Sequence, residues 1–282
     1  MNHDGTNDIL DLNDPSVLPP IVRSGPDTLF RVHDVRVGAG TAWGEMDRGD
    51  WSSFEGHPIG VGALGVLADD VTGYALATVR RPATWMVSTE ISIDAFSGLL
   101  EASSVRMEAR VVQSDSVGGF ATAEIFDQHD ALVAAATQRG RWIPLATSGK
   151  MKQPPPIPSI PEGDLGDMLN ASARVDGSDL VLGLTCGELH ANVEHTMQGG
   201  ITIAAADLAA TAALAVEGMP PLVTASLRIG YARGVLVGDS VEYRAVTKHR
   251  GRSLGIAEVT ASVAGKVTAV VHVVAGPLAT GR

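Results

Sequence analysis

The two halves of this chain show the same features in the same order. In the first half, a short stretch ending in Gly44-Glu45-Met46 is followed by a polar loop and an apolar run from Ala63 to Ala77. In the second half, Gly187-Glu188-Leu189 is followed by a loop and an apolar run from Ile201 to Val216. A long-period internal repeat indicates that one structural unit occurs twice. The alternative is a pair of unrelated α+β domains.

Four segments with the alternating or fully apolar character of β-strands follow each apolar run. In the first half they are residues 84–95, 104–112, 120–126 and 131–138, and in the second half residues 223–231, 240–247, 253–263 and 266–274. Turn residues such as Gly118-Gly119 and Gly265 separate them. Each half is therefore predicted to contain one strand, one helix and then four strands.

The apolar runs are predicted to be buried helices. Hydrophobic residues make up 45% of the chain but aromatic residues only 4%, so the core must consist mainly of Ala, Val, Leu and Ile. A helix that is apolar on nearly every face must be covered on nearly every face. A strongly curved antiparallel sheet wrapped around each helix would provide that cover, which makes the predicted fold class α+β.

Proline-rich segments mark the predicted domain boundaries. Residues 1–27 contain four prolines and are read as an N-terminal arm with little structure of its own. Residues 147–172 contain a second group of prolines, which favours a semi-rigid linker. The two structural units are then residues 28–146 and residues 173–282.

Composition and charge argue against several classes of protein. A net charge of -11 disfavours nucleic acid as a partner, because phosphate binding depends on a dense basic patch. The single cysteine, Cys186, excludes an internal disulfide and a cysteine-pair zinc site, and no second His or Cys stands at ligand spacing from His57 or His195. The acidic N-terminus predicts no secretory signal, and the apolar runs are short for a membrane span. We therefore expect a cytoplasmic protein without a metal or a membrane partner.

One carboxylate stands inside each apolar run. Asp207 lies in the middle of the second run, and Asp69 occupies the same place in the first. A carboxylate in an apolar helix is costly unless it is paired or hydrogen-bonded. Such groups are candidates for a general base or a nucleophile. The alternative is that each simply points to solvent.

Gly199 and Gly200 begin the second apolar run, and free backbone N–H groups at a helix start can bind a negative oxygen. Gly199 and Asp207 are eight residues apart, which is about 12 Å along a helix, so one helix cannot apply both to the same carbonyl. Two helices packed antiparallel would solve this. One composite site would pair Asp69 with residues 192–200, and the other would pair Asp207 with residues 54–62.

These residues resemble the PaaI-type branch of the hotdog thioesterases. The family pattern has an Asn, then His-Gly-Gly six residues later, and a helical Asp nine residues after the His. In this chain the matching residues are Asn192, Gln198-Gly199-Gly200 and Asp207. Both spacings are kept, and Gln stands in place of His. The resemblance covers most of residues 180–275 and, more loosely, residues 30–143. It implies a tandem, or double, hotdog that hydrolyses an acyl-CoA to free acid and CoA and needs no cofactor beyond the CoA of its substrate.

The resemblance also implies roles for individual residues. An Asp acts as general base or nucleophile, and the Gly199 N–H polarises the thioester carbonyl. Asn192 and Gln198 position the thioester or the water. Ser88 and Thr224, at matching places on the two strands after the helices, hold water beside Asp69 and Asp207. The predicted site residues are therefore Asp69, Ser88, Asn192, Gln198, Gly199, Gly200, Asp207 and Thr224.

The first-half loop departs from the family pattern. It has Phe54 in place of the Asn and Gly60-Val61-Gly62 in place of His-Gly-Gly, so the site containing Asp207 lacks polar partners. We therefore predict that the site built on Asp69 is the competent one. Arg250 and Arg252 lie in a basic turn of the kind that binds CoA phosphates in hotdog thioesterases, although a solvated hairpin tip explains the turn equally well.

Two other functions stay open at this stage. The altered first-half loop favours a non-catalytic protein that only binds acyl-CoA. A double-hotdog enoyl-CoA hydratase is disfavoured because the chain contains no segment of the Gly-Asp-x-Asn-Pro-x-His type. A Gly-x-Ser-x-Gly nucleophile elbow is also missing, which argues against an α/β-hydrolase. Further association of chains through hotdog sheets is expected.

Overall fold

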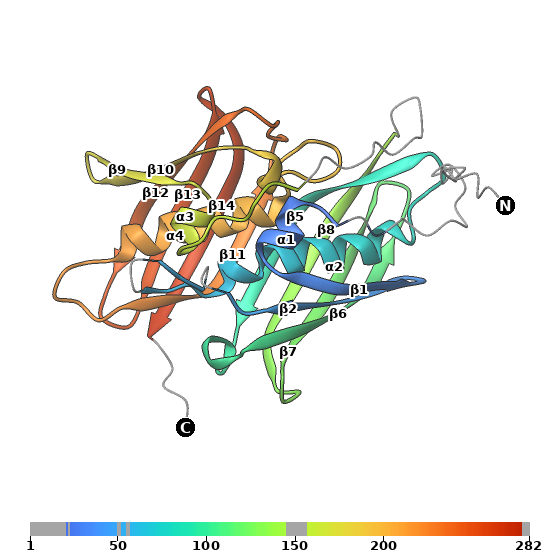
Figure 1. Ribbon diagram of the computed structural model, residues 1–282, viewed down its shortest axis with the longest axis horizontal. Coiled ribbons are helices and arrows are strands. Elements are labelled where there is room, and N and C mark those ends of the chain that lie inside the picture. Colours follow the sequence, from blue (N-terminus) through green and yellow to red (C-terminus); the bar gives the residue numbers. More distant parts are fainter. Residues whose placement is uncertain (1–20, 22, 50–51, 55–56, 145–156, 278–282) are drawn as a thin grey trace.

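A computed structural model describes residues 21, 23–49, 52–54, 57–144 and 157–277. Its main feature is one twelve-stranded antiparallel sheet (Figure 1). The first half contributes, in order across the sheet, β1 Val32–Gly38, β2 Thr41–Asp47, β6 Ser104–Ser114, β7 Gly118–Asp127, β8 Leu132–Pro144 and β5 Thr84–Ala95. The second half continues with β11 Leu222–Tyr231, β14 Lys266–Pro277, β13 Gly255–Val263, β12 Ser240–Arg250, β10 Asp179–Thr185 and β9 Ser172–Asp176.

This strand order is the same when it is read outward from the centre in either direction. β5 pairs with β11 at the centre, with Arg228 opposite Ser92, and each half then adds its strands in the same sequence. The turn between β13 and β14 shows how local residues set this topology: Ala264 and Gly265 both have positive φ (47° and 74°), as a tight two-residue hairpin requires. The repeat predicted from the sequence is thus a double hotdog.

The two long helices, α2 Gly65–Ala77 and α4 Gly199–Leu214, lie along the long axis of the molecule with the strands passing behind them (Figure 1). They correspond to the predicted runs, and a short 3-10 helix, η2 Val61–Leu64, precedes α2. The Ala-rich sequence of α4 favours a helix, and Gly218 with positive φ follows its end. Nearly all of α4 is buried, as its apolar pattern predicts.

The N-terminal halves of α2 and α4 pack against each other in antiparallel fashion. Gly65 faces Ile203, and a Cβ added to Gly200 would lie 2.4 Å from the Cα of Val66. Only glycine allows the two backbones to approach this closely. The head-to-tail helix packing expected from the composite-site argument is therefore present.

The structure adds elements that the sequence pattern did not predict. Each half has two strands of the twelve-stranded sheet before its long helix, not one: β1 and β9 form the sheet edges, and every residue of β9 is exposed. An exposed polar edge strand has no apolar alternation, so the periodicity does not reveal it. Short elements also lie between the strands: β3 Ser53–Phe54, β4 His57–Pro58, η3 Leu99–Glu101 and η4 Glu188–His190.

Two short helices lie in ranges expected to be arm or linker. Helix α1, Gly25–Leu29, begins inside the range assigned to the N-terminal arm. Helix α3, Leu165–Met168, lies inside the range assigned to the linker, and Leu165 is fully buried. The proline-rich residues 147–156 and residues 1–20 lie outside the described residues, so the linker and arm conformations stay predictions. Within the described residues, no helix reaches the length and apolarity of a membrane span.

Candidate active site

Asp69 lies near the start of α2 and is partly buried. Its Oδ1 accepts hydrogen bonds from Ser88 Oγ at 2.8 Å and from Gln138 Nε2 at 3.3 Å. Its carboxylate also accepts from the backbone N–H groups of Gly199 and Gly200, which belong to the other half of the chain. Burial raises the pKa of Asp69, and these four donors oppose the rise. The sequence-based pairing of Asp69 with the Gly199 amide is therefore present in the structure.

Gln138 is a site residue that the sequence analysis missed. It lies on β8 with no exposed surface, and its Nε2 also donates to Ser88 Oγ at 2.6 Å. Its Oε1 accepts from the Thr72 hydroxyl, which fixes the amide orientation. Asp69, Ser88 and Gln138 thus form one hydrogen-bonded group. The available signal was an amide two residues after the apolar run 133–136, but the strand register is needed to place it beside Ser88.

The backbone at Gly199 is held from two sides. A Cβ added there would lie 2.8 Å from Tyr231 Oη and 2.9 Å from Asp69 Oδ2, so glycine is required for the close approach. Tyr231 Oη donates to the Gly199 carbonyl at 2.9 Å. The Gly199 carbonyl and the Gly200 N–H belong to the same planar peptide group. By binding the carbonyl, Tyr231 therefore also fixes the direction in which the Gly200 N–H points, which is toward Asp69. Tyr231 is a second site residue without a recognised sequence signal.

Two predicted polar residues of the second-half loop are engaged within the protein. Asn192 Oδ1 accepts from the backbone N–H groups of Glu194 and Thr196 and from the Thr196 hydroxyl, at 3.0 to 3.3 Å. It therefore shapes the loop before α4. Gln198 Nε2 donates to Asp70 Oδ1 at 2.7 Å, so its amide contacts the residue beside Asp69. The direct contact of either side chain with a thioester stays a prediction.

The second composite site also places a helix carboxylate against a backbone N–H of the other half, but the side chains around the carboxylate differ. The Gly62 N–H donates to Asp207 Oδ2 at 2.9 Å, with the Thr224 hydroxyl beside the same carboxyl. The register of β11 with β14 places Val273 where β8 has Gln138. Asp207 is 0% exposed, and burial raises its pKa to about 6. This site is closed and has neither the amide nor the access of the Asp69 site.

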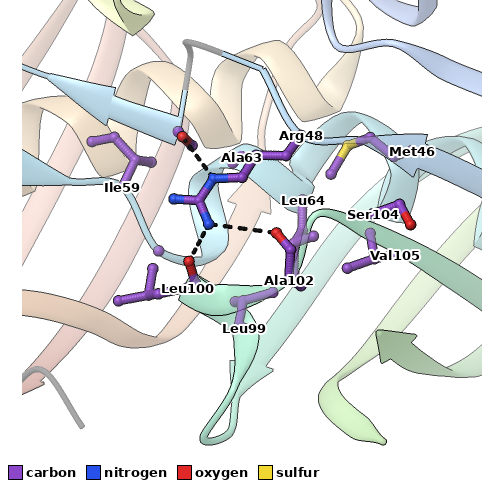
Figure 2. Close-up of a pocket in the computed structure, with 12 residues that line it drawn as sticks. Met46, Arg48, Ile59, Ala63, Leu64, Leu99, Leu100, Ala102, Ser104 and Val105 are labelled. Carbon is purple, nitrogen blue, oxygen red and sulfur yellow. Dashed lines mark hydrogen bonds between the residues drawn. The ribbon is translucent and has the colours of Figure 1, made fainter. Parts of the chain in front are cut away.

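An apolar pocket (Figure 2) is lined in part by Gly60 and Ala63, which flank Gly62 of the second site in the chain, and Asp69 is not among its lining residues. Its cavity of about 40 Å³ is lined by Met46, Leu64, Leu99 and Val105, among others. The guanidinium of Arg48 points into it and donates to Ser52 and to the backbone carbonyls of residues 100 and 102. Arg48 therefore ties together the loops that border the pocket.

The basic turn does not reach the Asp69 site. The guanidinium of Arg250 donates to the carbonyls of Leu214, Pro220 and Gly251, so it closes the C-terminal end of α4. Gly199 stands at the other end of this 16-residue helix, roughly 22 Å away at 1.5 Å per residue. Arg252 is exposed in the same turn. Binding of CoA phosphates by either arginine stays a prediction.

Among the residues that the structure describes, one group of side chains could hold a metal ion on geometric grounds. Potential ligand atoms of His33, Asp34 and Glu45 lie within 4.8 Å of one another on β1 and β2. The His33 ring already contacts Asp34 at 2.8 Å and Asp47 at 3.6 Å, which raises its pKa against the effect of burial. The contacts of His33 with Asp34 and Asp47 account for this cluster without a metal ion.

Comparison with known families identifies both halves. Residues 194–270 match the family model of the thioesterase superfamily. Residues 13–141 match the family model of the acyl-CoA thioesterase C-terminal domain. No curated protein sequence matches the chain.

Solved structures share the whole double fold. The TesB protein of Mycobacterium avium subsp. paratuberculosis superposes with a TM-score of 0.58 at 11% identity and covers 88% of this chain and 96% of its own. An acyl-CoA thioesterase II from Mycobacterium marinum has a TM-score of 0.54 at 13% identity, with the same coverage of 88% and 96%. At this identity the likeness shows the fold, and the family models carry the assignment.

Proposed function

Because the chain belongs to the hotdog thioesterases and is a thioester hydrolase, we propose that it hydrolyses an acyl-CoA at the composite site of Asp69. The observation that carries this proposal is the placement of the Asp69, Ser88 and Gln138 group from one half against the Gly199 and Gly200 amides of the other. A general base, Asp69, and two backbone N–H donors are then close enough to act on the same thioester carbonyl, as attack by water requires.

The chemistry follows from these donors and acceptors. Asp69 takes a proton from a water that Ser88 and Gln138 orient, and the water oxygen forms a bond to the thioester carbonyl carbon. The carbonyl oxygen becomes negative and accepts from the Gly199 and Gly200 N–H groups, which bind Asp69 itself in the free protein. Collapse of this intermediate breaks the carbon–sulfur bond, and CoA leaves as the thiolate, which takes up the proton held by Asp69. Direct attack by the Asp69 carboxylate is the other route that this geometry allows.

Access supports the choice of site. Asp69 keeps part of its surface exposed, whereas Asp207 is fully enclosed and has a valine opposite it in place of Gln138. The altered first-half loop that favours a non-catalytic protein belongs to the Asp207 site. It therefore leaves the Asp69 site intact.

The experiment is a direct assay of the purified chain. Acyl-CoAs with short, medium, long and aromatic acyl groups are incubated with the protein, and free CoA is measured with a thiol reagent. We expect CoA release from at least one class, which also identifies the acyl group. No release from any member of the panel would refute acyl-CoA hydrolysis. Cytoplasmic location and association through sheets stay predictions, the latter to be measured by solution mass.

The pKa of Asp69 predicts the acid limb of the activity. The base must be ionised, so kcat/KM falls as the pH drops through the Asp69 pKa. Because burial raises that pKa, half-maximal activity should lie above the ordinary aspartate value of 3.8. A pH profile of kcat/KM measures this limb. A limb at or below the ordinary value would contradict Asp69 as the base.

Substitution of Gln138 by Val introduces the residue type that the second site has at the equivalent position, Val273. We expect Gln138→Val to lower kcat roughly 10- to 100-fold with a smaller change in KM, because Ser88 and Asp69 lose the donor that orients them. The matched control is Thr224→Val in the closed site, which should leave kcat unchanged. Steady-state kinetics of both variants test this, and equal losses in the two would contradict the assignment.

A further inference from the structure

The neighbour of the proposed base, Asp70, lies in an unusual polar cluster. Gln198 Nε2 donates to Asp70 Oδ1 at 2.7 Å, and Asp70 Oδ2 is buried without a donor. The carboxyl group of Asp27 lies within hydrogen-bonding distance of Asp70. Asp27 is only 7% exposed. The two carboxyl groups therefore lie next to each other beside Gln198. The turn that ends at Gln198, just before α4, is called the Gln198 turn below.

Asp27 is held as an acceptor by its own segment. The backbone N–H and the hydroxyl of Ser24 both donate to Asp27 Oδ2 at 2.6 Å. Helix α1, which carries Asp27, contacts α2 and η4, and in Figure 1 it is drawn in front of the place where α2 and α4 meet. A Cβ added to Gly25 would lie 2.3 Å from the Glu188 carbonyl oxygen, so α1 packs closely on the second half as well. This segment thus links α2 to the loop before α4.

A carboxylate has acceptor atoms only, so two carboxyl groups can hydrogen-bond to each other only when one carries a proton. Asp27 already accepts two hydrogen bonds, and Asp70 has a buried oxygen without a donor. Asp70 is therefore the group that carries the proton. Burial, followed by the charge of Asp27, raises the pKa of Asp70 well above its ordinary value, which is consistent with this choice.

We propose that Asp70 is a neutral carboxylic acid that shares one proton with Asp27, and that this pair clamps the Gln198 turn to α2 so that the Gly199 and Gly200 amides face Asp69. Asp70 acts through Gln198 and is a positioning residue. The expected effect of Asp70 on the rate rests on the proposed function. The sharing of a proton between Asp70 and Asp27 is independent of that function.

Loss of this proton should lower the stability of the folded state. Among the described residues, the charged groups that act on Asp70 are Asp27 from α1 and Asp69 from its own helix, and Gln198 faces it from the turn before α4. Tyr231 faces Asp69 from β11. Deprotonation would bring three negative charges together at the clamp. Because the folded state binds this proton more tightly, stability falls as the pH rises from the unfolded pKa towards the raised folded one.

The Asp70→Asn substitution tests the clamp because an amide mimics the protonated acid. Its Nδ2 can donate to Asp27 while its Oδ1 still accepts from Gln198. We expect this variant to melt at a higher temperature than the wild type, with a difference that grows as the pH rises. Asp94→Asn, at an exposed position on β5, is the matched control and should show no such difference. A less stable Asp70→Asn protein at alkaline pH would overturn the proposal.

Infrared spectroscopy reads the proton directly. At neutral pH, the wild-type spectrum should contain a protonated carboxyl C=O band that Asp70→Asn loses and Asp94→Asn keeps. Wild-type kcat should also fall at alkaline pH, and Asp70→Asn should remove that fall. Asp70→Leu, which breaks both contacts, should lower kcat by 10-fold or more at neutral pH. If no acyl-CoA is cleaved, the band and the melting difference still decide the proposal, and absence of the band overturns it.

Discussion

Asp69→Asn is expected to lower kcat for acyl-CoA hydrolysis by about 10²- to 10⁴-fold, the usual contribution of a positioned general base. Asn keeps the size of Asp and can still accept from Ser88, but it cannot take a proton from water or attack a carbonyl. Thermal melting should show a folded protein, because the variant loses the acceptor for the Gly199 and Gly200 N–H groups but keeps the apolar packing of α2. Free CoA release with the best acyl-CoA of the panel is the measurement.

The repeated architecture supplies the control for this variant. Asp207→Asn changes the equivalent carboxylate of the closed site and should leave kcat within a factor of two or so of the wild type. Full activity in Asp69→Asn together with loss in Asp207→Asn would place the chemistry at the Gly62 site. Loss in both variants would indicate that the two sites depend on each other.

The fold was predictable because it depends on local patterns. The apolar run from Ile201 to Val216 requires a buried helix, and the alternating segments after it require strands, whatever their neighbours. The matched order in the two halves then indicates a repeat. The edge strand β9 was missed because all of its residues are exposed, so it has no apolar alternation. The edge strand β1 was missed because an irregularity between His33 and Arg36, where Asp34 has a positive φ, interrupts the alternation of its valines. Their existence follows from pairing with β2 and β10.

The site was predictable where spacing along one segment determines geometry. The distance from Gly199 to Asp207 along one helix excludes a single-helix site and so predicts the antiparallel pair. Gln138 was not predictable in the same way, because its position beside Ser88 depends on the register of β5 with β8. A single residue of slip would turn the side chain to the other face of the sheet.

The role of Gln198 was also beyond the sequence pattern. Its place in the family motif suggested contact with the thioester, whereas the structure directs its amide to Asp70. The proposed partner of Asp70, Asp27, lies in a segment expected to have little structure of its own. Contacts between segments far apart in the chain decide which polar groups face the substrate and which hold the site together.

The closed site should destabilise the protein at neutral pH, and Asp207→Asn should relieve this. The pKa of Asp207 rises from 3.8 to about 6 because burial disfavours the ionised form. A rise of about 2 units corresponds to roughly 3 kcal/mol of stability lost once the group is ionised in both states. Asn has no charge, and its Oδ1 can still accept from the Gly62 N–H. The variant is therefore expected to be more stable by up to about 3 kcal/mol at pH 8.

The pH dependence identifies the cause of that gain. Below about pH 3, Asp207 is neutral in the folded and unfolded chains alike, so the two proteins should differ little. Between about pH 4 and 6 the folded wild type holds the proton while the unfolded chain releases it, so its stability falls and the advantage of Asn grows. Thermal melting across this range should show a difference that rises to about 5–10 °C and then stays constant. A constant difference at every pH would trace the effect to packing, and a less stable variant at pH 8 would show that the Gly62 hydrogen bond to the carboxylate outweighs its burial.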